Sequence, residues 1–141
     1  MAANPVTPGS LLGASISADD PMKLMKALRA GLPTASLRRF KQATGLADHE
    51  LSELLQIGAR TLSRLKSSSR LPPDISDRLY AVASVYSLAA KVLGNRDAAA
   101  GWLASPQFGL QYHRPLEFLA TDLGRQQVKT LLNQIEYGML A

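Results

Sequence analysis

Two short helical patterns separated by only three residues constrain this chain more than any other feature. Asp48–Leu55 and Ala59–Lys66 each repeat apolar residues at helical spacing, and only Gln56–Gly58 lies between them. A connection this short turns the second helix sharply against the first, which predicts a helix-turn-helix. On the second helix, Leu62 and Leu65 fall on one side of the helical wheel and the polar residues fall on the other.

The polar side of the second helix is basic. Between Gly58 and Leu71 the chain has four cations and no acidic residue. A helix that rests on its neighbour through leucines and turns cations outward suits the major groove of DNA. The residues that we predict to contact DNA are Arg60, Thr61, Ser63, Arg64, Lys66 and Ser67. The alternative is a purely structural helix pair whose outer Arg and Ser side chains are only solvated, because periodicity alone fits both interpretations.

The positive charge is concentrated in the middle of the chain. Residues 36–80 hold eight cations and five acids, a net charge of +3 out of +5 for the whole chain. Asp48, Glu50 and Glu53 all lie on the first helix of the pair, whose first turn tolerates negative charge through the helix dipole. The second helix therefore keeps a cationic footprint that favours nucleic acid.

Composition favours an all-α protein and excludes several kinds of site. The chain has 141 residues, is 46% hydrophobic and contains no cysteine, which removes disulfides, thiolate metal sites and cysteine nucleophiles. His49 and His113 show no metal-ligand spacing, so we expect no metal and no cofactor. Because neither a Gly-rich phosphate loop nor a nucleophile–base pattern emerges, we predict that the protein is not an enzyme.

No segment looks like a membrane span. No stretch approaches the roughly 20 apolar residues needed to cross a bilayer, and the N-terminus lacks a basic-then-apolar signal pattern. We therefore expect a cytoplasmic protein with no membrane partner.

We predict a boundary between an N-terminal segment, residues 1–35, and a domain that begins at residue 36. Residues 1–35 read as a flexible segment with a short helix at Met22–Ala30, and residues 1–20 have a Pro- and Gly-rich composition that buries little. Ser36 is positioned to cap a helix that ends at Gly45. We expect this helix to support the helix-turn-helix from behind.

A long helix is predicted to connect this region to a second one. Residues 36–93 are predicted to form the helix-turn-helix domain, and residues 94–141 are predicted to form a small C-terminal helical module. The long helix belongs to the first of these, opened by Asp74 and ended by Gly94. The long helix either links the two parts or pairs with its copy in a dimer. Three helices are expected in the module: 97–104, then 116–123 stopped by Gly124, and 125–137.

Short motifs spaced along the second half resemble a known family. They are Leu71, Ser76–Leu79, Ala98, Trp102-Leu103, Pro106, Pro115–Thr121, Gly124, Val128, Leu131-Leu132 and Ile135–Gly138. With Thr61–Arg64 in place of the family's basic helix, residues 36–141 resemble the Xre/MbcA/ParS antitoxins. Ala47 and Arg114 depart from the pattern, because a hydroxyl residue commonly caps the helices that follow them. With alanine at position 47, we expect Asp48 to cap the first of these helices.

The resemblance implies an antitoxin of a type II toxin-antitoxin system. Such a protein binds and neutralises a RES-type toxin that destroys NAD, and represses its own operon by binding operator DNA. Carried over by position, the residues that reach the toxin are Glu136, Tyr137, Gly138, Met139, Leu140 and Ala141. Physical reasoning leaves two outcomes for the apolar tail: it fills a partner's pocket, or Met139 and Leu140 fold back on the last helix. Trp102 and Phe118 read as core residues.

A homodimer would place two basic helices on two half-sites about one helical turn apart. The runner-up function is a free-standing dimeric helix-turn-helix transcription regulator, without a toxin, whose C-terminal module serves dimerisation alone.

Overall fold

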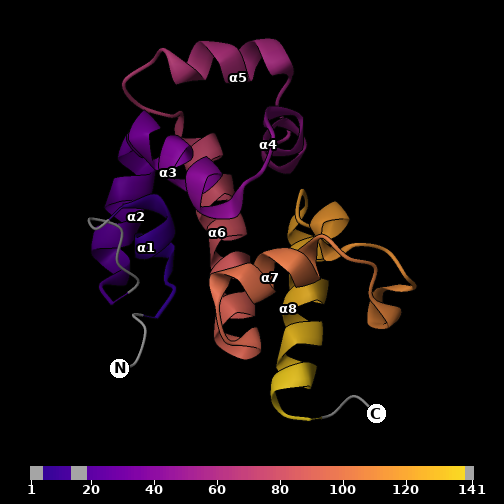
Figure 1. The fold of residues 1–141 in the computed structure, drawn as a ribbon. Coiled ribbons are helices and arrows are strands. Elements are labelled where there is room, and N and C mark those ends of the chain that lie inside the picture. Colours follow the sequence, from indigo (N-terminus) through magenta and orange to yellow (C-terminus); the bar gives the residue numbers. More distant parts are fainter. Residues whose placement is uncertain (1–4, 14–18, 139–141) are drawn as a thin grey trace.

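The computed structural model describes residues 5–13 and 19–138, and its regular elements are all helical (Figure 1). The predicted all-α class is confirmed. The elements are α1 (Pro8–Leu12), α2 (Pro21–Ala30), α3 (Thr34–Thr44), α4 (Asp48–Leu55), α5 (Ala59–Lys66), α6 (Pro73–Leu93), α7 (Arg96–Leu103), η1 (Phe108–Leu110), η2 (Pro115–Phe118) and α8 (Asp122–Glu136). Within these described ranges, no helix has the length and apolar character to cross a membrane.

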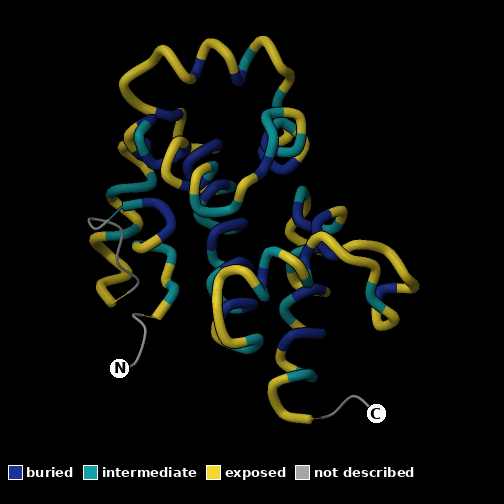
Figure 2. Tube along the Cα trace, viewed as in Figure 1, coloured by how far each residue is buried: buried dark blue, intermediate teal, exposed yellow. Residues whose placement is uncertain are grey.

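Helix α6 runs through the centre of the molecule and links its two halves. It packs against α1, α2 and α4, which precede it in the chain, and against α7 and α8, which follow it. Leu79, Val82, Ala83 and Val85 are fully buried, and most of α6 is dark blue or teal in Figure 2. Of the two roles left open for this helix, the structure shows the linking one, because its apolar positions are used inside the protomer.

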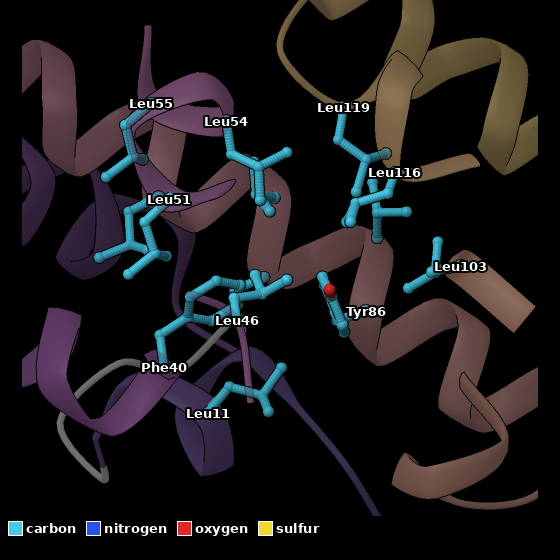
Figure 3. Close-up of a cluster of buried hydrophobic side chains, with 14 of the residues drawn as sticks. Leu11, Phe40, Leu46, Leu51, Leu54, Leu55, Tyr86, Leu103, Leu116 and Leu119 are labelled. Atoms are coloured by element: carbon cyan, nitrogen blue, oxygen red, sulfur yellow. The ribbon is translucent and has the colours of Figure 1, made fainter. Parts of the chain in front are cut away.

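The buried side chains form one continuous core. Phe40 of α3 meets Tyr86 of α6 edge to face, with ring centroids 5.4 Å apart, and burial raises the pKa of the Tyr86 phenol. Figure 3 shows this cluster continuing from Leu11 of α1 to Leu54 of α4 and on to Leu116 of η2. The helix-turn-helix and the C-terminal module are therefore joined by packing rather than by a flexible tether.

Helix α1 overturns the expectation that the N-terminal residues bury little. Leu11 and Leu12 are each only 1% exposed, and α1 packs on α3 and α6. Thr7 begins the helix: its hydroxyl accepts from the Ser10 backbone N–H at 3.1 Å, and the Ser10 hydroxyl accepts in return from the Thr7 N–H at 2.8 Å. Composition missed this because it averages two core leucines with their small polar neighbours.

Helix α3 begins earlier than the predicted Ser36 cap, which was wrong. Thr34 is its first residue and Ser36 lies buried inside it. The reason is tertiary: the Thr34 N–H donates to the Ser69 carbonyl at 3.1 Å, in a short pairing between the start of α3 and the loop after α5. The predicted stop is confirmed, since Gly45 takes the left-handed conformation at φ 72°.

Gly124 does not stop a helix, contrary to prediction. The segment from Pro115 forms only the short 3-10 helix η2, and α8 starts at Asp122 with Gly124 inside its first turn. The Gly124 N–H donates to the Thr121 hydroxyl at 3.0 Å, and an added Cβ at Gly124 would lie 1.9 Å from the Phe118 carbonyl oxygen. Glycine is needed here for a close approach of two backbones.

Two helix starts that lack a hydroxyl cap are completed by an acid three residues later. A Glu50 carboxylate oxygen accepts from the Ala47 N–H at 3.0 Å, and a Glu117 carboxylate oxygen accepts from the Arg114 N–H at 2.9 Å. The second bond lowers the pKa of Glu117. Ala47 is the cap residue of α4, so the expectation that Asp48 would cap this helix was wrong.

Several residues of the family-like motifs have structural roles. The fully buried Ser76 accepts from the Leu32 N–H at 2.8 Å, and the Arg78 guanidinium donates to the Leu55 carbonyl at the end of α4 at 3.0 Å. Trp102 and Phe118 pack, partly buried, against the core as predicted.

Candidate functional site

The structure confirms the helix-turn-helix with the predicted helix bounds, Asp48–Leu55 and Ala59–Lys66. The turn is made by Gln56 in the left-handed conformation, at φ 55° and ψ 45°, and by the Ile57 N–H, which donates to the Ser52 carbonyl at 3.0 Å. Leu62 and Leu65 of α5 are buried, which leaves the opposite side of the helix free.

The outer face of α5 is exposed and basic. This helix crosses one end of the molecule, with most of its length coloured as exposed in Figure 2. Among the predicted DNA-contacting residues, Thr61 is half-buried and the others are exposed: Arg60, Ser63, Arg64, Lys66 and Ser67. Within the described part of the chain no acid pairs with Arg60 or Arg64. Their guanidinium groups are therefore available to an external anion.

Lys66 has a partner inside the protein. Asp48 lies between two lysines: one carboxylate oxygen is 2.5 Å from the Lys66 Nζ and the other is 2.6 Å from the Lys41 Nζ. This arrangement ties the last turn of α5 to the start of α4 and the end of α3. Hydrogen bonds from Lys41 and Lys66 lower the pKa of Asp48 to about 2.

Acid should weaken the fold through this carboxylate. A pKa held at about 2 in the folded state against 3.8 otherwise means that the stabilisation is present above pH 3.8 and is lost as the pH falls to about 2. Asp48→Asn should therefore have a lower melting temperature than the parent at pH 7, and the difference should vanish near pH 2. Circular dichroism melts across this pH range measure it.

The matched control is Glu53→Gln, which neutralises an exposed carboxylate on the same helix that makes no ion pair in the described structure. Equal melting curves for Asp48→Asn and Glu53→Gln at every pH would contradict a stabilising role for the Asp48 ion pairs.

Of the predicted partner-binding residues, Glu136, Tyr137 and Gly138 are described and lie at the C-terminal end of α8, remote from α5 (Figure 1). Glu136 has a carboxylate oxygen 3.9 Å from the Lys91 Nζ, Tyr137 is 73% exposed, and Gly138 is left-handed at φ 65°. Met139, Leu140 and Ala141 lie outside the described residues. The described part of this set is thus an exposed helix end.

Sequence reasoning missed a second exposed surface in the C-terminal module. Phe108 and Tyr112, in the segment between the predicted helices 97–104 and 116–123, are 80% and 69% exposed. Their rings meet edge to face with centroids 5.7 Å apart. The sequence signal for this surface is that two large aromatic residues lie within five residues outside a predicted helix. Such residues either pack in a core or contact a partner.

Two family models match the chain in succession. The Antitoxin Xre-like helix-turn-helix domain matches residues 23–84, and the Antitoxin Xre/MbcA/ParS C-terminal toxin-binding domain matches residues 88–138. The chain belongs to the Xre/MbcA/ParS antitoxin family. The first match begins at residue 23, so α2 also has a counterpart in the family, although sequence reasoning found none before residue 36.

Two relatives carry the name Antitoxin Xre. The protein from Photorhabdus laumondii is 28% identical over 116 residues, which cover 81% of this chain and 78% of the relative. The protein from Yersinia enterocolitica is also 28% identical over 116 residues, covering 81% of this chain and 69% of the relative. The similarity therefore extends through most of the length of both antitoxins.

In this member of the antitoxin family the two matched domains touch at the turn of the helix-turn-helix. The Gln56 side-chain amide donates a hydrogen bond to the Ala120 carbonyl, just before the Thr121 cap of α8. Because Gln56 also makes the left-handed turn between α4 and α5, the orientation of the basic helix is tied to the C-terminal module.

Proposed function

We propose that this protein is the antitoxin of a type II toxin-antitoxin system, which neutralises a RES-type NAD-degrading toxin and represses its own operon. It acts in the cytoplasm by binding, without catalysis of its own. The observation that carries the proposal is a basic helix at one end of the fold, whose Arg60 and Arg64 form no ion pair among the described residues, together with a match to a toxin-binding domain over residues 88–138.

The DNA-binding half of the proposal assigns a role to each of the predicted DNA-contacting residues. Arg60 and Arg64 contact phosphates or guanine edges, with hydrogen bonds from Thr61, Ser63 and Ser67. Lys66 contributes positive potential and holds the helix through Asp48. A homodimer presents two such helices to half-sites about one helical turn apart, so its affinity for DNA is higher than that of a single helix.

The toxin-binding half assigns the end of the chain to the partner. Glu136, Tyr137 and Gly138 form the exposed end of α8, and Met139–Ala141 follow as three apolar or small residues. In the proposal this end reaches the mouth of the toxin's active site and closes it to NAD.

A growth-rescue experiment tests the proposal. The protein encoded by the neighbouring reading frame is induced alone or together with this chain. We expect it to arrest growth and deplete NAD when alone, and the intact chain to restore both. Deleting Tyr137–Ala141 should lower rescue by about tenfold or more, measured as surviving colonies, because interface aromatics dominate binding energy.

The matched control is Arg64→Ala, which should rescue fully because Arg64 belongs to α5, and α5 is remote from the end of α8 (Figure 1). If the intact chain restores neither growth nor NAD, the antitoxin role is wrong and the free-standing regulator takes its place. If the tail deletion rescues as well as the intact chain, the assignment of the tail is wrong.

A further inference from the structure

An exposed aromatic pair projects from the C-terminal module. Phe108 and Tyr112 contact each other, and we call them the aromatic knob. Aromatic side chains bury roughly 150–250 Å² each when covered, and at 80% and 69% exposure most of this area faces solvent. Aromatics are also the residue types enriched at the centre of protein interfaces. The knob therefore has the chemistry of a docking element.

The backbone holds the knob in place. The Gln107 N–H donates to the His113 carbonyl at 3.1 Å, and the Tyr112 N–H donates to the Gln107 carbonyl at 2.8 Å, which closes residues 107–113 into a tight hairpin. Gln111 and Tyr112 both adopt positive φ values, 55° and 65°, a conformation that L side chains rarely take. Backbone strain of this kind clusters at binding sites.

The hairpin is also seated on α8. At Gly109 an added Cβ would lie 2.7 Å from a methyl carbon of Leu131, so the absence of a side chain lets the hairpin approach the helix. Leu110, between the two aromatics, is buried. The knob is thus presented in one orientation, and little freedom remains to be lost when a partner covers it.

A groove of about 660 Å³, with His113 in its lining, lies between the hairpin and α8. Phe118 and Leu123 give it apolar walls, and four glutamines line it: Gln111, Gln126, Gln127 and Gln134. Among the described residues that line it there is no Lys, Arg, Asp or Glu. Phosphate binding needs cations, which argues against nucleic acid here. Side-chain amides both donate and accept, which suits a polypeptide backbone.

We infer that the aromatic knob and this groove form the main docking surface for the toxin. The inference rests on the proposed function, because the match to a toxin-binding domain spans residues 88–138 and so contains both features. The occupant is an uncharged segment of the toxin: its apolar side chains cover the knob and Leu123, and its backbone bonds to the glutamine amides. The tail after Tyr137 then adds to an interface that this surface establishes.

The test replaces the knob in the intact chain. Phe108→Ala/Tyr112→Ala should weaken the dissociation constant for the protein encoded by the neighbouring reading frame by about 100-fold, measured by calorimetry, because central interface aromatics commonly account for tenfold each or more. Leu123→Asp, at a side chain that is 68% exposed, should weaken it by about tenfold through an unpaired charge. Both variants should keep the parent melting temperature and DNA affinity.

The control is Met22→Ala/Met25→Ala, which removes two apolar side chains that are 64% and 44% exposed on α2, outside the toxin-binding match. This variant should bind the neighbouring protein with a dissociation constant within about twofold of the parent value.

A second measurement uses the parent chain: backbone hydrogen exchange at residues 107–113 should be slower in the complex than in the free protein.

The outcomes separate the two proposals. If the intact chain binds the neighbouring protein but the knob variant binds equally well, or hydrogen exchange at 107–113 is unchanged in the complex, the docking surface is wrong while the antitoxin function stands. If the intact chain itself neither binds nor rescues, the proposed function fails.

Discussion

Replacing Arg60 and Arg64 together with alanine is expected to weaken binding to the DNA upstream of this gene by about 100-fold, since each well-placed arginine contributes roughly tenfold. Both side chains are exposed on the outer face of α5, while the helix is held through Leu62, Leu65 and the Asp48 ion pair. The fold should therefore be unchanged. Fluorescence anisotropy with a labelled duplex measures the affinity.

The salt dependence identifies the kind of contact that is lost. If both arginines bind phosphates, the slope of log affinity against log salt should decrease in magnitude by about 1.8, at roughly 0.9 per contact. Arg96→Ala/Lys129→Ala is the matched control: it removes two positive charges from α7 and α8, away from α5. Equal losses for the two double variants would mean that only net charge matters, and α5 would not be the reading helix.

Gly124→Ala is expected to destabilise the fold by about 3 kcal/mol or more, because overpacking against a backbone cannot be relieved by a side-chain rotation. The added methyl would sit 1.9 Å from the Phe118 carbonyl oxygen and 3.0 Å from the Thr121 hydroxyl that caps α8. Relief requires α8 to move away from η2, which also loses the cap. Urea unfolding should show the loss, and the melting temperature should fall by roughly 10 °C.

The same substitution at Gly101 is the control. Gly101 lies in α7, is exposed, and has nothing within 4 Å of an added Cβ. Alanine in an open helical position is better than glycine by roughly 0.5–1 kcal/mol, so Gly101→Ala should be slightly stabilising. A Gly124→Ala variant as stable as the parent would show that the η2–α8 junction does not need a close approach.

The helix-turn-helix was predictable because its signals are local. The bounds of α4 and α5 follow from apolar spacing and a three-residue turn, and the basic face of α5 follows from helical geometry. Each depends on residues within a few positions of one another. The family-like motifs of the second half were readable for the same reason: they are short and fixed in spacing.

The two wrong cap predictions concern residue types that can either cap a helix or bond to another element. A serine with a helical pattern after it reads as a cap, yet Ser36 is buried because the pairing of Thr34 with Ser69 starts α3 earlier. An acid at a helix start also reads as a cap, yet Asp48 bonds two lysines from other helices. In each case the deciding partner lies on another element.

The helical class, the position of α5 and the basic side of α5 follow from the sequence alone, because they depend on a 3.6-residue period within one segment. Three further features required the folded structure: Leu11 and Leu12 belong to the core, Gly124 allows a close backbone contact, and Phe108 and Tyr112 stay exposed. Burial and close approach are properties of pairs distant in the chain, and such pairs are set by packing.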